Sequence, residues 1–190
     1  AKKIMEIKKF IRIYDDVFPL FVLKNFTKVC NHFNYEKTKL ADDSINENIR
    51  KVQGRFLSNM KESLTEAHWF NLLHHIFTTH CVHYIQSQNL DVRLDINVHD
   101  IQILKYNTSN FYNWHVDDGH NTPRTLSCIY FVNDNYKGGN LCFRNPDTTD
   151  EHTIEKKSNR LIVWPSSFLY PHTVKPVLEG ERLSVAAWAR

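Results

Sequence analysis

Apolar residues recur at two different periods along the chain, and the change of period falls near residue 95. Before that point the spacing is helical. It predicts one helix over 20–33, opened by Pro19, and a second over 65–88, where Thr65 is the expected cap. The N-terminal half of the chain is therefore predicted to be rich in helix.

Two segments of the N-terminal half lack this helical period. Residues 10–17 predict a short strand that ends in an acidic turn. Residues 36–64 are polar and have no stable period, which favours a loop with room for one strand. Within that stretch, residues 42–64 are either a mobile lid over an extended peptide or an ordinary surface loop.

From residue 99 onward the texture changes to short apolar runs separated by turn residues. Eight strands are predicted, over 100–106, 112–117, 125–133, 140–144, 152–156, 160–164, 171–175 and 182–189. Eight short strands with such connections predict a double-stranded β-helix, or jelly roll. With the N-terminal helices packed on its outside, the fold class is α+β.

The length and composition fit one domain. The 190 residues, 42% of them hydrophobic and 24% charged, are typical of a globular chain. We expect a single domain over 1–190, with a helix-rich part over 1–95 and a jelly-roll core over 99–190. The net charge of +3 is too small a bias to indicate a nucleic-acid partner.

Cysteine usage and the N-terminus bear on location. The four cysteines are widely spaced and form no C-x-x-C pair, so we expect free thiols in a reducing compartment. The N-terminus is basic, but Arg12, Asp15 and Asp16 break the apolar stretch that follows it. Neither a signal peptide nor a membrane-spanning helix is predicted, which favours a cytoplasmic location.

The first candidate chemistry is His115-Val116-Asp117 in the predicted strand 112–117. Residues i and i+2 of a strand project to the same side, so both side chains are expected to enter one cavity. His172 begins a later strand and is expected to enter from the facing sheet. Two imidazoles and one carboxylate leave metal positions open, as in non-haem Fe(II) oxygenases. Either histidine alone is more often a surface residue or a hydrogen-bonded core residue.

The second candidate is Arg182, near the start of the last predicted strand. If a short turn joined its strand to that of His172, the arginine would lie beside the histidine. A buried guanidinium requires a carboxylate partner, and the nearby Glu179 and Glu181 belong to the turn. A bound dicarboxylate would supply that partner. The alternative is an exposed strand arginine.

Further residues extend this pattern through the C-terminal half. In chain order they are Tyr106, Tyr112-x-x-His115-x-Asp117, Arg124 to Asn133, Tyr136 to Leu141, Trp164-Pro165-Ser166, His172-x-Val174-x-Pro176-Val177, Gly180-x-Arg182 and Trp188. This order resembles the prolyl 4-hydroxylase-type 2-oxoglutarate oxygenases, including the oxygen-sensor prolyl hydroxylases, and the PKHD-type hydroxylases. Asn140 departs from it, since glutamate often follows the double glycine. Arg182 favours the oxygen-sensor and PKHD-type members, because collagen-type members use lysine there.

The resemblance implies a role for each site residue. His115, Asp117 and His172 would hold Fe(II), with no catalytic residue beyond these metal ligands. The distal carboxylate of 2-oxoglutarate would bind Arg182, helped by the Tyr130 hydroxyl, with Tyr106, Leu141 and Trp188 lining the pocket. Each of these has a purely structural alternative: the two tyrosines as barrel aromatics, Leu141 and Trp188 as core, and Gly138-Gly139 as a hairpin turn with positive φ.

The resemblance also implies a reaction. An unactivated C–H would be hydroxylated with O2, while 2-oxoglutarate is decarboxylated to succinate and CO2, and ascorbate would support activity. Asp117 favours hydroxylation over halogenation, because halogenases have a small residue there. A prolyl residue in a peptide or protein is the expected substrate, hydroxylated at C3 or C4, and a membrane partner is not expected. The alternatives are a nucleic-acid or small-molecule substrate, or a non-catalytic jelly-roll binding module.

Overall fold

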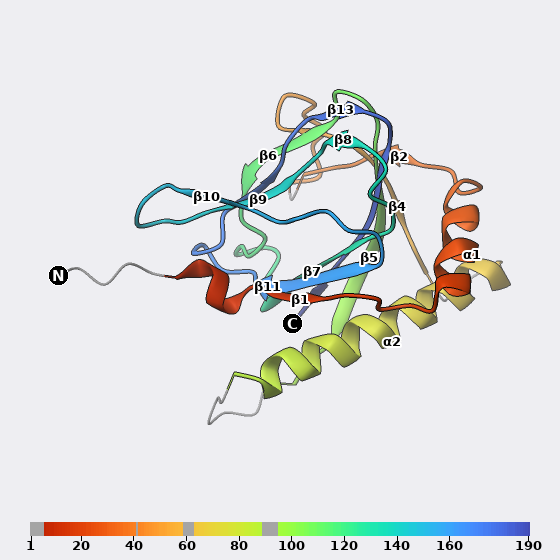
Figure 1. Cartoon of the computed structure of the whole chain (residues 1–190), viewed down its shortest axis with the longest axis horizontal. Helices are drawn as coiled ribbons and strands as arrows, with labels where there is room; N and C mark the ends of the chain where they lie inside the picture. Colours follow the sequence, from red (N-terminus) through yellow and green to blue (C-terminus); the bar gives the residue numbers. More distant parts are fainter. Residues whose placement is uncertain (1–5, 41, 59–62, 89–94) are drawn as a thin grey trace.

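The computed structural model describes residues 6–40, 42–58, 63–88 and 95–190. Two antiparallel sheets face each other, and two helices cover the outer side of the larger sheet (Figure 1). The larger sheet has the strand order β1-β11-β7-β14-β5-β4-β2, and the smaller has the order β10-β9-β12-β6-β3. Strands β13 and β8 form a separate two-stranded ribbon. The predicted jelly roll with external helices is thereby confirmed.

The elements have the following bounds. The N-terminal part contains η1 (Ile7–Phe10), β1 (Arg12–Tyr14), α1 (Leu20–Cys30), β2 (Glu36–Lys37), β3 (Arg50–Lys51), β4 (Gln53–Phe56) and α2 (Leu64–Gln86). The C-terminal part contains β5 (Val98–Tyr106), β6 (Phe111–His115), β7 (Leu126–Phe131), β8 (Lys137–Gly138), β9 (Leu141–Arg144), β10 (Glu151–Thr153), β11 (Arg160–Pro165), β12 (His172–Val174), β13 (Val177–Glu179) and β14 (Arg182–Ala189).

Each of the eight predicted strands is present, with ends that differ by a few residues. The segment 36–64 departs more from its prediction, because it contributes three short strands rather than one at most. Strand β4 pairs with β5, β2 pairs with β4, and β3 pairs with β6. Their hydrogen-bond partners are distant in sequence, so no local period marks them. Strands β3 and β4 fall within the candidate lid 42–64, so part of that segment belongs to the sheets, and its residues 59–62 lie outside the described residues.

The two helices form where the apolar period predicts them, but the cap of α2 differs. Ser63, not Thr65, precedes the first turn, and its hydroxyl accepts a hydrogen bond from the Glu66 backbone N–H at 3.2 Å. The spacing Ser63-x-x-Glu66 is that of a capping box. Pro19 stands at the N-cap of α1.

The apolar core has two layers, one on each side of the larger sheet. The first lies between this sheet and the helices, and the second lies between the two sheets. Strand β7 contributes to both, since Cys128 and Tyr130 face the helices while Ile129 and Phe131 face the smaller sheet. This alternation determines which side chains can reach a site between the sheets.

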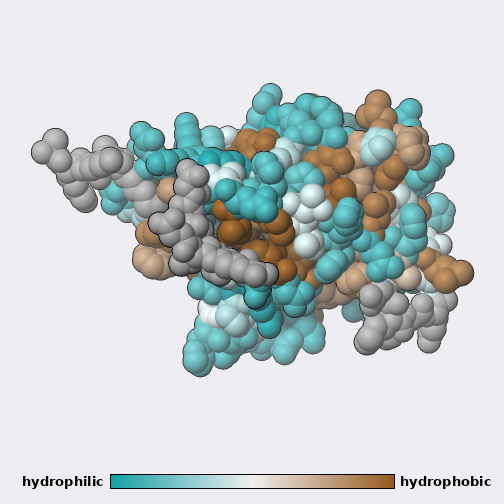
Figure 2. Space-filling view, turned by 90° about the horizontal axis from the view of Figure 1, so that it is seen from below, coloured by the Kyte–Doolittle hydropathy of each residue, from teal (hydrophilic) through white to brown (hydrophobic). Residues whose placement is uncertain are grey.

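The outer surface on the α2 side is largely hydrophilic, with scattered apolar areas (Figure 2). The exposed apolar side chains of α2 include Leu64 and Val82. None of the helices in the described part of the chain has both the length and the apolarity that crossing a bilayer requires. All four cysteines are buried and unbridged.

Candidate active site

His115 enters the space between the sheets because β6 carries a bulge. Opposite β12, His115 pairs with His172 and Tyr112 pairs with Val174, so β6 advances three residues while β12 advances two. A bulge re-aims the side chains that follow it. Tyr112 and His115 consequently lie on one face, stacked with ring centroids 3.5 Å apart. Trp114 points to the opposite face, where the Arg144 and Lys175 side chains contact its ring.

His172 is the direct strand neighbour of His115, which corrects one prediction. Both histidines belong to the smaller sheet, so His172 does not enter from the facing sheet. Their ring centroids are 4.2 Å apart. A pair of neighbouring strands, rather than the gap between two sheets, thus sets the separation of the two imidazoles.

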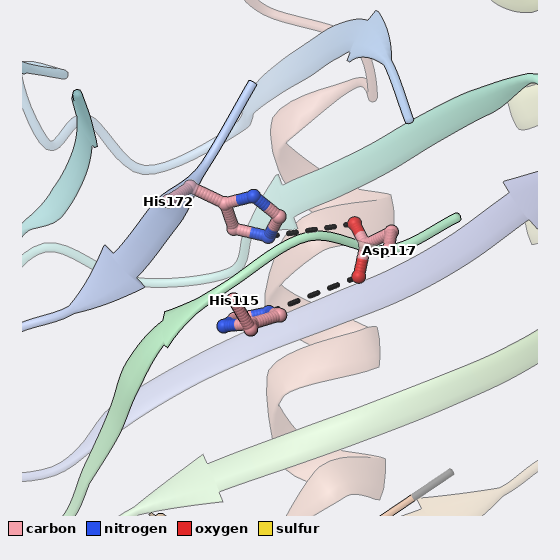
Figure 3. Close-up of side chains that lie close together, drawn as sticks. All are labelled: His115, Asp117 and His172. Atoms are coloured by element: carbon pink, nitrogen blue, oxygen red, sulfur yellow. Dashed lines mark ion pairs between the residues drawn. The ribbon is translucent and has the colours of Figure 1, made fainter. Parts of the chain in front are cut away.

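Asp117 also departs from its predicted setting. Strand β6 ends at His115, so Asp117 stands in the turn that follows and not in the strand itself. Its carboxylate nevertheless lies between the two imidazoles. The His115 Nε2 is 3.8 Å from Oδ1 and the His172 Nε2 is 3.4 Å from Oδ2 (Figure 3). The three side chains converge, as the sequence predicts, although the strand geometry assumed for them was wrong.

Backbone carbonyls determine which nitrogen each imidazole presents. His115 Nδ1 lies 2.7 Å from the Asn113 carbonyl oxygen, and His172 Nδ1 lies 3.0 Å from the Tyr170 carbonyl oxygen. A carbonyl only accepts, so both Nδ1 atoms carry the hydrogen and both Nε2 atoms keep a lone pair. Histidines that bind a metal usually donate the hydrogen of their other ring nitrogen in this way.

The electrostatics of the site favour the protonation states that bind a metal. Burial and the adjacent His172 lower the pKa of His115 to about 3. Burial by itself would raise the pKa of Asp117, but the two imidazoles, the Ser127 hydroxyl and Arg124 lower it overall. At neutral pH His115 is therefore neutral and Asp117 is ionised.

These residues fit a metal ion. The three ligand atoms lie within 4.8 Å of one another, and the described residues contain no second such group of His, Cys, Asp or Glu. Their side chains are 16%, 8% and 6% exposed for His115, Asp117 and His172. Two imidazoles and one carboxylate on one side of an ion leave positions open for other ligands, which is the facial arrangement of non-haem iron oxygenases.

A cavity of about 800 Å³ opens beside this triad. Of the residues predicted to line a cosubstrate pocket, the structure places Tyr106, Leu141 and Trp188 on its wall. The wall also includes Tyr112, Arg124 and Trp164. Both sheets contribute to it, so the cavity is a property of the sandwich rather than of one loop.

Arg182 lies in the facing sheet and not beside His172, which corrects the predicted short-turn connection. Strand β14 lies between β7 and β5, and Arg182 is paired in register with Tyr106. The Tyr106 ring, which lines the cavity, has its centroid 4.8 Å from the guanidinium carbon. The arginine therefore approaches the cavity from the sheet opposite the triad.

The guanidinium of Arg182 is fully buried and incompletely paired. Its Nη1 donates to the Ser184 hydroxyl at 2.9 Å, but Nε and Nη2 have no hydrogen-bond partner. Within the described residues no carboxylate forms an ion pair with it. A β-carbon at Gly139, which has φ of +60°, would lie 3.2 Å from the Arg182 Cδ. The positive φ predicted for the double glycine is thus present, and it leaves room for this side chain. Two unpaired donors on a buried cation fit a carboxylate ligand.

Tyr130 does not face this cavity, which corrects its predicted role. Its hydroxyl donates to the Asn159 Oδ1 at 2.9 Å, and its ring packs edge-on against Phe18 at 5.4 Å. Both contacts lie on the helix side of the larger sheet. Because strand neighbours alternate, it is Ile129 and Phe131 that point into the space between the sheets, and Tyr130 is a structural aromatic.

Two functional contacts were not assigned from sequence. Arg124 stacks on Trp188 with 3.8 Å between the guanidinium carbon and the ring centroid, and its Nη1 donates to the Asp117 backbone oxygen at 3.3 Å. The Ser127 hydroxyl donates to the Asp117 Oδ2 at 2.6 Å. Both residues stand in the motif-bearing stretch, and a serine among apolar residues of a buried strand was the available signal.

Fold and site together define a jelly-roll protein with a non-haem iron triad. Residues 101–190 match the family model of the 2OG-Fe(II) oxygenase superfamily. A PKHD-type hydroxylase from Stenotrophomonas maltophilia is 34% identical over 95 residues, which cover 45% of this chain and 40% of that protein. This part of the chain is thus similar to the 2OG-Fe(II) oxygenase superfamily and to the PKHD-type hydroxylases. The chain spans less than half the length of the curated relatives it matches.

Solved structures agree on the fold over almost the whole chain. A Pseudomonas putida prolyl-4-hydroxylase has a TM-score of 0.72 at 19% identity, over 95% of this chain and 92% of that one. A Trichoplax adhaerens prolyl hydroxylase, in complex with a peptide of the hypoxia inducible factor, has a TM-score of 0.74 at 17% identity, over 94% and 82%. The fold therefore extends beyond the matched C-terminal half and includes the N-terminal helices.

Proposed function

We propose that this chain is an Fe(II)- and 2-oxoglutarate-dependent dioxygenase, working as one domain, that hydroxylates an unactivated C–H bond. One observation carries the proposal. A complete set of metal ligands lines the cavity from one sheet, and Tyr106, which lines it from the other, lies against the buried Arg182 guanidinium with its unpaired donors. The ligand set of the triad requires a cation, and the Arg182 guanidinium requires an anion. A metal chelated by a dicarboxylate satisfies both.

Each residue then has a defined task. His115, Asp117 and His172 hold the iron through two Nε2 atoms and a carboxylate oxygen. Once bound, the iron supplies the O2 chemistry that converts 2-oxoglutarate to succinate and CO2 and inserts one oxygen atom into the C–H bond. Arg182 binds the distal carboxylate through Nε and Nη2, and the surrounding apolar wall keeps water out. Tyr106, Leu141 and Trp188 form that wall.

The proposed substrate is a prolyl residue in a peptide or protein. The support comes from the names of the relatives, which are PKHD-type and prolyl hydroxylases, and from the structural neighbour that carries a bound peptide. The cavity extends from the triad to the β2 and β4 region, where Lys39, Arg55 and Phe56 line it. A peptide backbone has room to lie there. Use of ascorbate and a cytoplasmic, reducing location remain predictions, the latter supported by four unbridged thiols.

The test is turnover of 2-oxoglutarate to succinate with Fe(II), with and without proline-containing peptides. We expect peptide-dependent succinate and a peptide mass gain of one oxygen atom. His115→Ala and Asp117→Ala should lose far more activity than the about 10- to 100-fold that follows loss of an outer-shell partner. Equal turnover by these variants would remove the iron assignment. Oxygen insertion into an oligonucleotide instead of a peptide would overturn the substrate assignment alone.

A further inference from the structure

Asp117 is held in place by contacts from outside its own strand. Asp117 follows the end of β6, so no strand pairing orients it. The larger sheet supplies the contacts instead. The Ser127 hydroxyl donates to the Asp117 Oδ2 at 2.6 Å, and the Asp118 backbone N–H donates to the Ser166 carbonyl oxygen at 3.1 Å. A ligand from a turn of one sheet is thus held by Ser127 of the other sheet, while its neighbour Asp118 is held by Ser166, the residue that follows β11.

The two serines are themselves joined. Their hydroxyl oxygens are 2.8 Å apart, and each residue is 1% exposed. A hydroxyl has only one hydrogen to donate, and that of Ser127 is directed to Asp117. Ser166 must therefore donate to Ser127. Both hydrogens point along one line towards the carboxylate, which strengthens the terminal hydrogen bond by polarisation.

The two carboxylate oxygens of Asp117 consequently have different surroundings. Oδ2 receives the Ser127 hydrogen bond and also lies 3.4 Å from the His172 Nε2. Oδ1 receives no hydrogen bond within the described residues, and its close neighbours are the His115 Nε2 at 3.8 Å and an Arg124 nitrogen at 3.9 Å. Oδ1 is thus the oxygen left free for a metal. We infer that Ser127, supported by Ser166, is a positioning residue that engages Oδ2 and presents Oδ1 of Asp117 to the iron.

The neighbours of Ser127 account for a small residue at this position. In the larger sheet Ser127 is paired with Trp164 on one side and with Trp188 on the other. Both indoles line the cavity. A serine between two tryptophans leaves a gap into which the Asp117 carboxylate fits, while its hydroxyl closes the gap with a hydrogen bond.

The inference rests on the proposed iron site, and metal binding tests it without any turnover. The full chain is titrated anaerobically with Fe(II), and with Co(II) as a spectroscopic probe. Ser127→Ala should raise the metal dissociation constant by about 10- to 100-fold and change the visible Co(II) spectrum, because Oδ2 is released. Ser166→Ala should have a smaller effect in the same direction, and Ser127→Thr, which keeps the hydroxyl, should restore tight binding.

Ser158→Ala is the matched control, because its hydroxyl donates to the Val132 carbonyl oxygen at 3.0 Å away from the triad. It should leave both readouts unchanged. If Ser127→Ala binds Co(II) with unaltered affinity and spectrum, the positioning role is overturned while the iron site stands. If the unaltered chain binds neither metal, or if His115→Ala binds as well as the unaltered chain, the proposed function fails first.

A kinetic readout separates positioning from general damage. Ser127→Ala should lower kcat and leave the KM for 2-oxoglutarate close to that of the unaltered chain, since the Arg182 end of the cavity is intact. If kcat and the affinity for 2-oxoglutarate fell by equal factors, the serine would act only on the stability of the fold. That result would overturn the inference.

Discussion

Two arginines of the larger sheet are buried, and the chain treats them differently. Arg160, at the start of β11, is 7% exposed and receives the Asp15 carboxylate in a bidentate contact, with Nε–Oδ1 at 2.7 Å and Nη2–Oδ2 at 3.0 Å. Arg182, at the start of β14, is 0% exposed and lies against the Ser184 hydroxyl, the Tyr136 phenol and two aromatic ring faces, with no carboxylate partner among the described residues. The more deeply buried cation is the one without a carboxylate.

The contrast shows what a buried arginine needs when it serves the fold alone. Burying a charge costs several kcal/mol unless a counter-charge and hydrogen bonds offset it. At Arg160 the chain provides both from Asp15 and from the Glu155 backbone oxygen, at 2.7 Å. At Arg182 the described residues provide no carboxylate, and the Nε and Nη2 donors have no hydrogen-bond partner. The missing carboxylate is therefore expected from a ligand.

The largest expected effect is on 2-oxoglutarate binding. Arg182→Ala should weaken it by about 10- to 100-fold, the equivalent of the roughly 1.5–3 kcal/mol that hydrogen bonds to a charged group contribute. Arg160→Ala should leave it unchanged. The measurement is the KM for 2-oxoglutarate together with calorimetric binding to the metal-loaded chain. Equal losses in the two variants would abolish the distinction between the arginines.

A second, intermediate effect is on stability without 2-oxoglutarate, where only the replacement of Arg160 should destabilise the fold. Arg160→Met should lower the free energy of unfolding by about 1–2 kcal/mol, because bidentate hydrogen bonds to a partly exposed carboxylate are lost. Arg182→Met should leave it unchanged or raise it by about 1 kcal/mol, since an unpaired buried charge is removed and the side-chain volume is kept. Urea unfolding measures both. A greater loss in Arg182→Met would indicate that the fold already satisfies its guanidinium.

The smallest effect is the pH dependence of the stability that the pair of Asp15 and Arg160 contributes. The Arg160 hydrogen bonds lower the pKa of Asp15 from 3.8 to about 2 in the folded chain. A lowered folded-state pKa stabilises the protein above pH 3.8, and this stabilisation is lost as the pH falls towards 2. Asp15→Asn should therefore cost less than about 1 kcal/mol at pH 7, because Asp15 is partly exposed, and nothing near pH 2. A cost that persists at pH 2 would mean that the pairing is not ionic.

Much of the site follows from residue types and their order. The triad and Arg182 were assigned from sequence, and the structure brings His115, Asp117 and His172 together as expected. Tyr106, Leu141 and Trp188 also reach the cavity. The family resemblance, rather than strand alternation, assigned Tyr106, Leu141 and Trp188 to the pocket.

The errors share one cause, which is that pairing partners and bulges are not local properties. The pairing of β6 with β12 ends at His115, so counting residues from His115 to Asp117 as if they stood in one strand gave the wrong geometry. Tyr130 lies on the helix side because β7 has its register set by β11 and β14. Ser127 was overlooked because its partner, Asp117, comes from a turn of the other sheet.

By itself the sequence determined the jelly-roll class and the helices outside it. It also determined the three metal ligands, His115, Asp117 and His172, and the buried cation, Arg182. Only the tertiary structure decided that the two histidines are strand neighbours, that Arg182 faces them from the opposite sheet, and that Ser127 holds Asp117. The physical reason is that side-chain chemistry and local periodicity are written in neighbouring residues. Strand order, register and burial arise when segments distant in sequence bury apolar surface against one another.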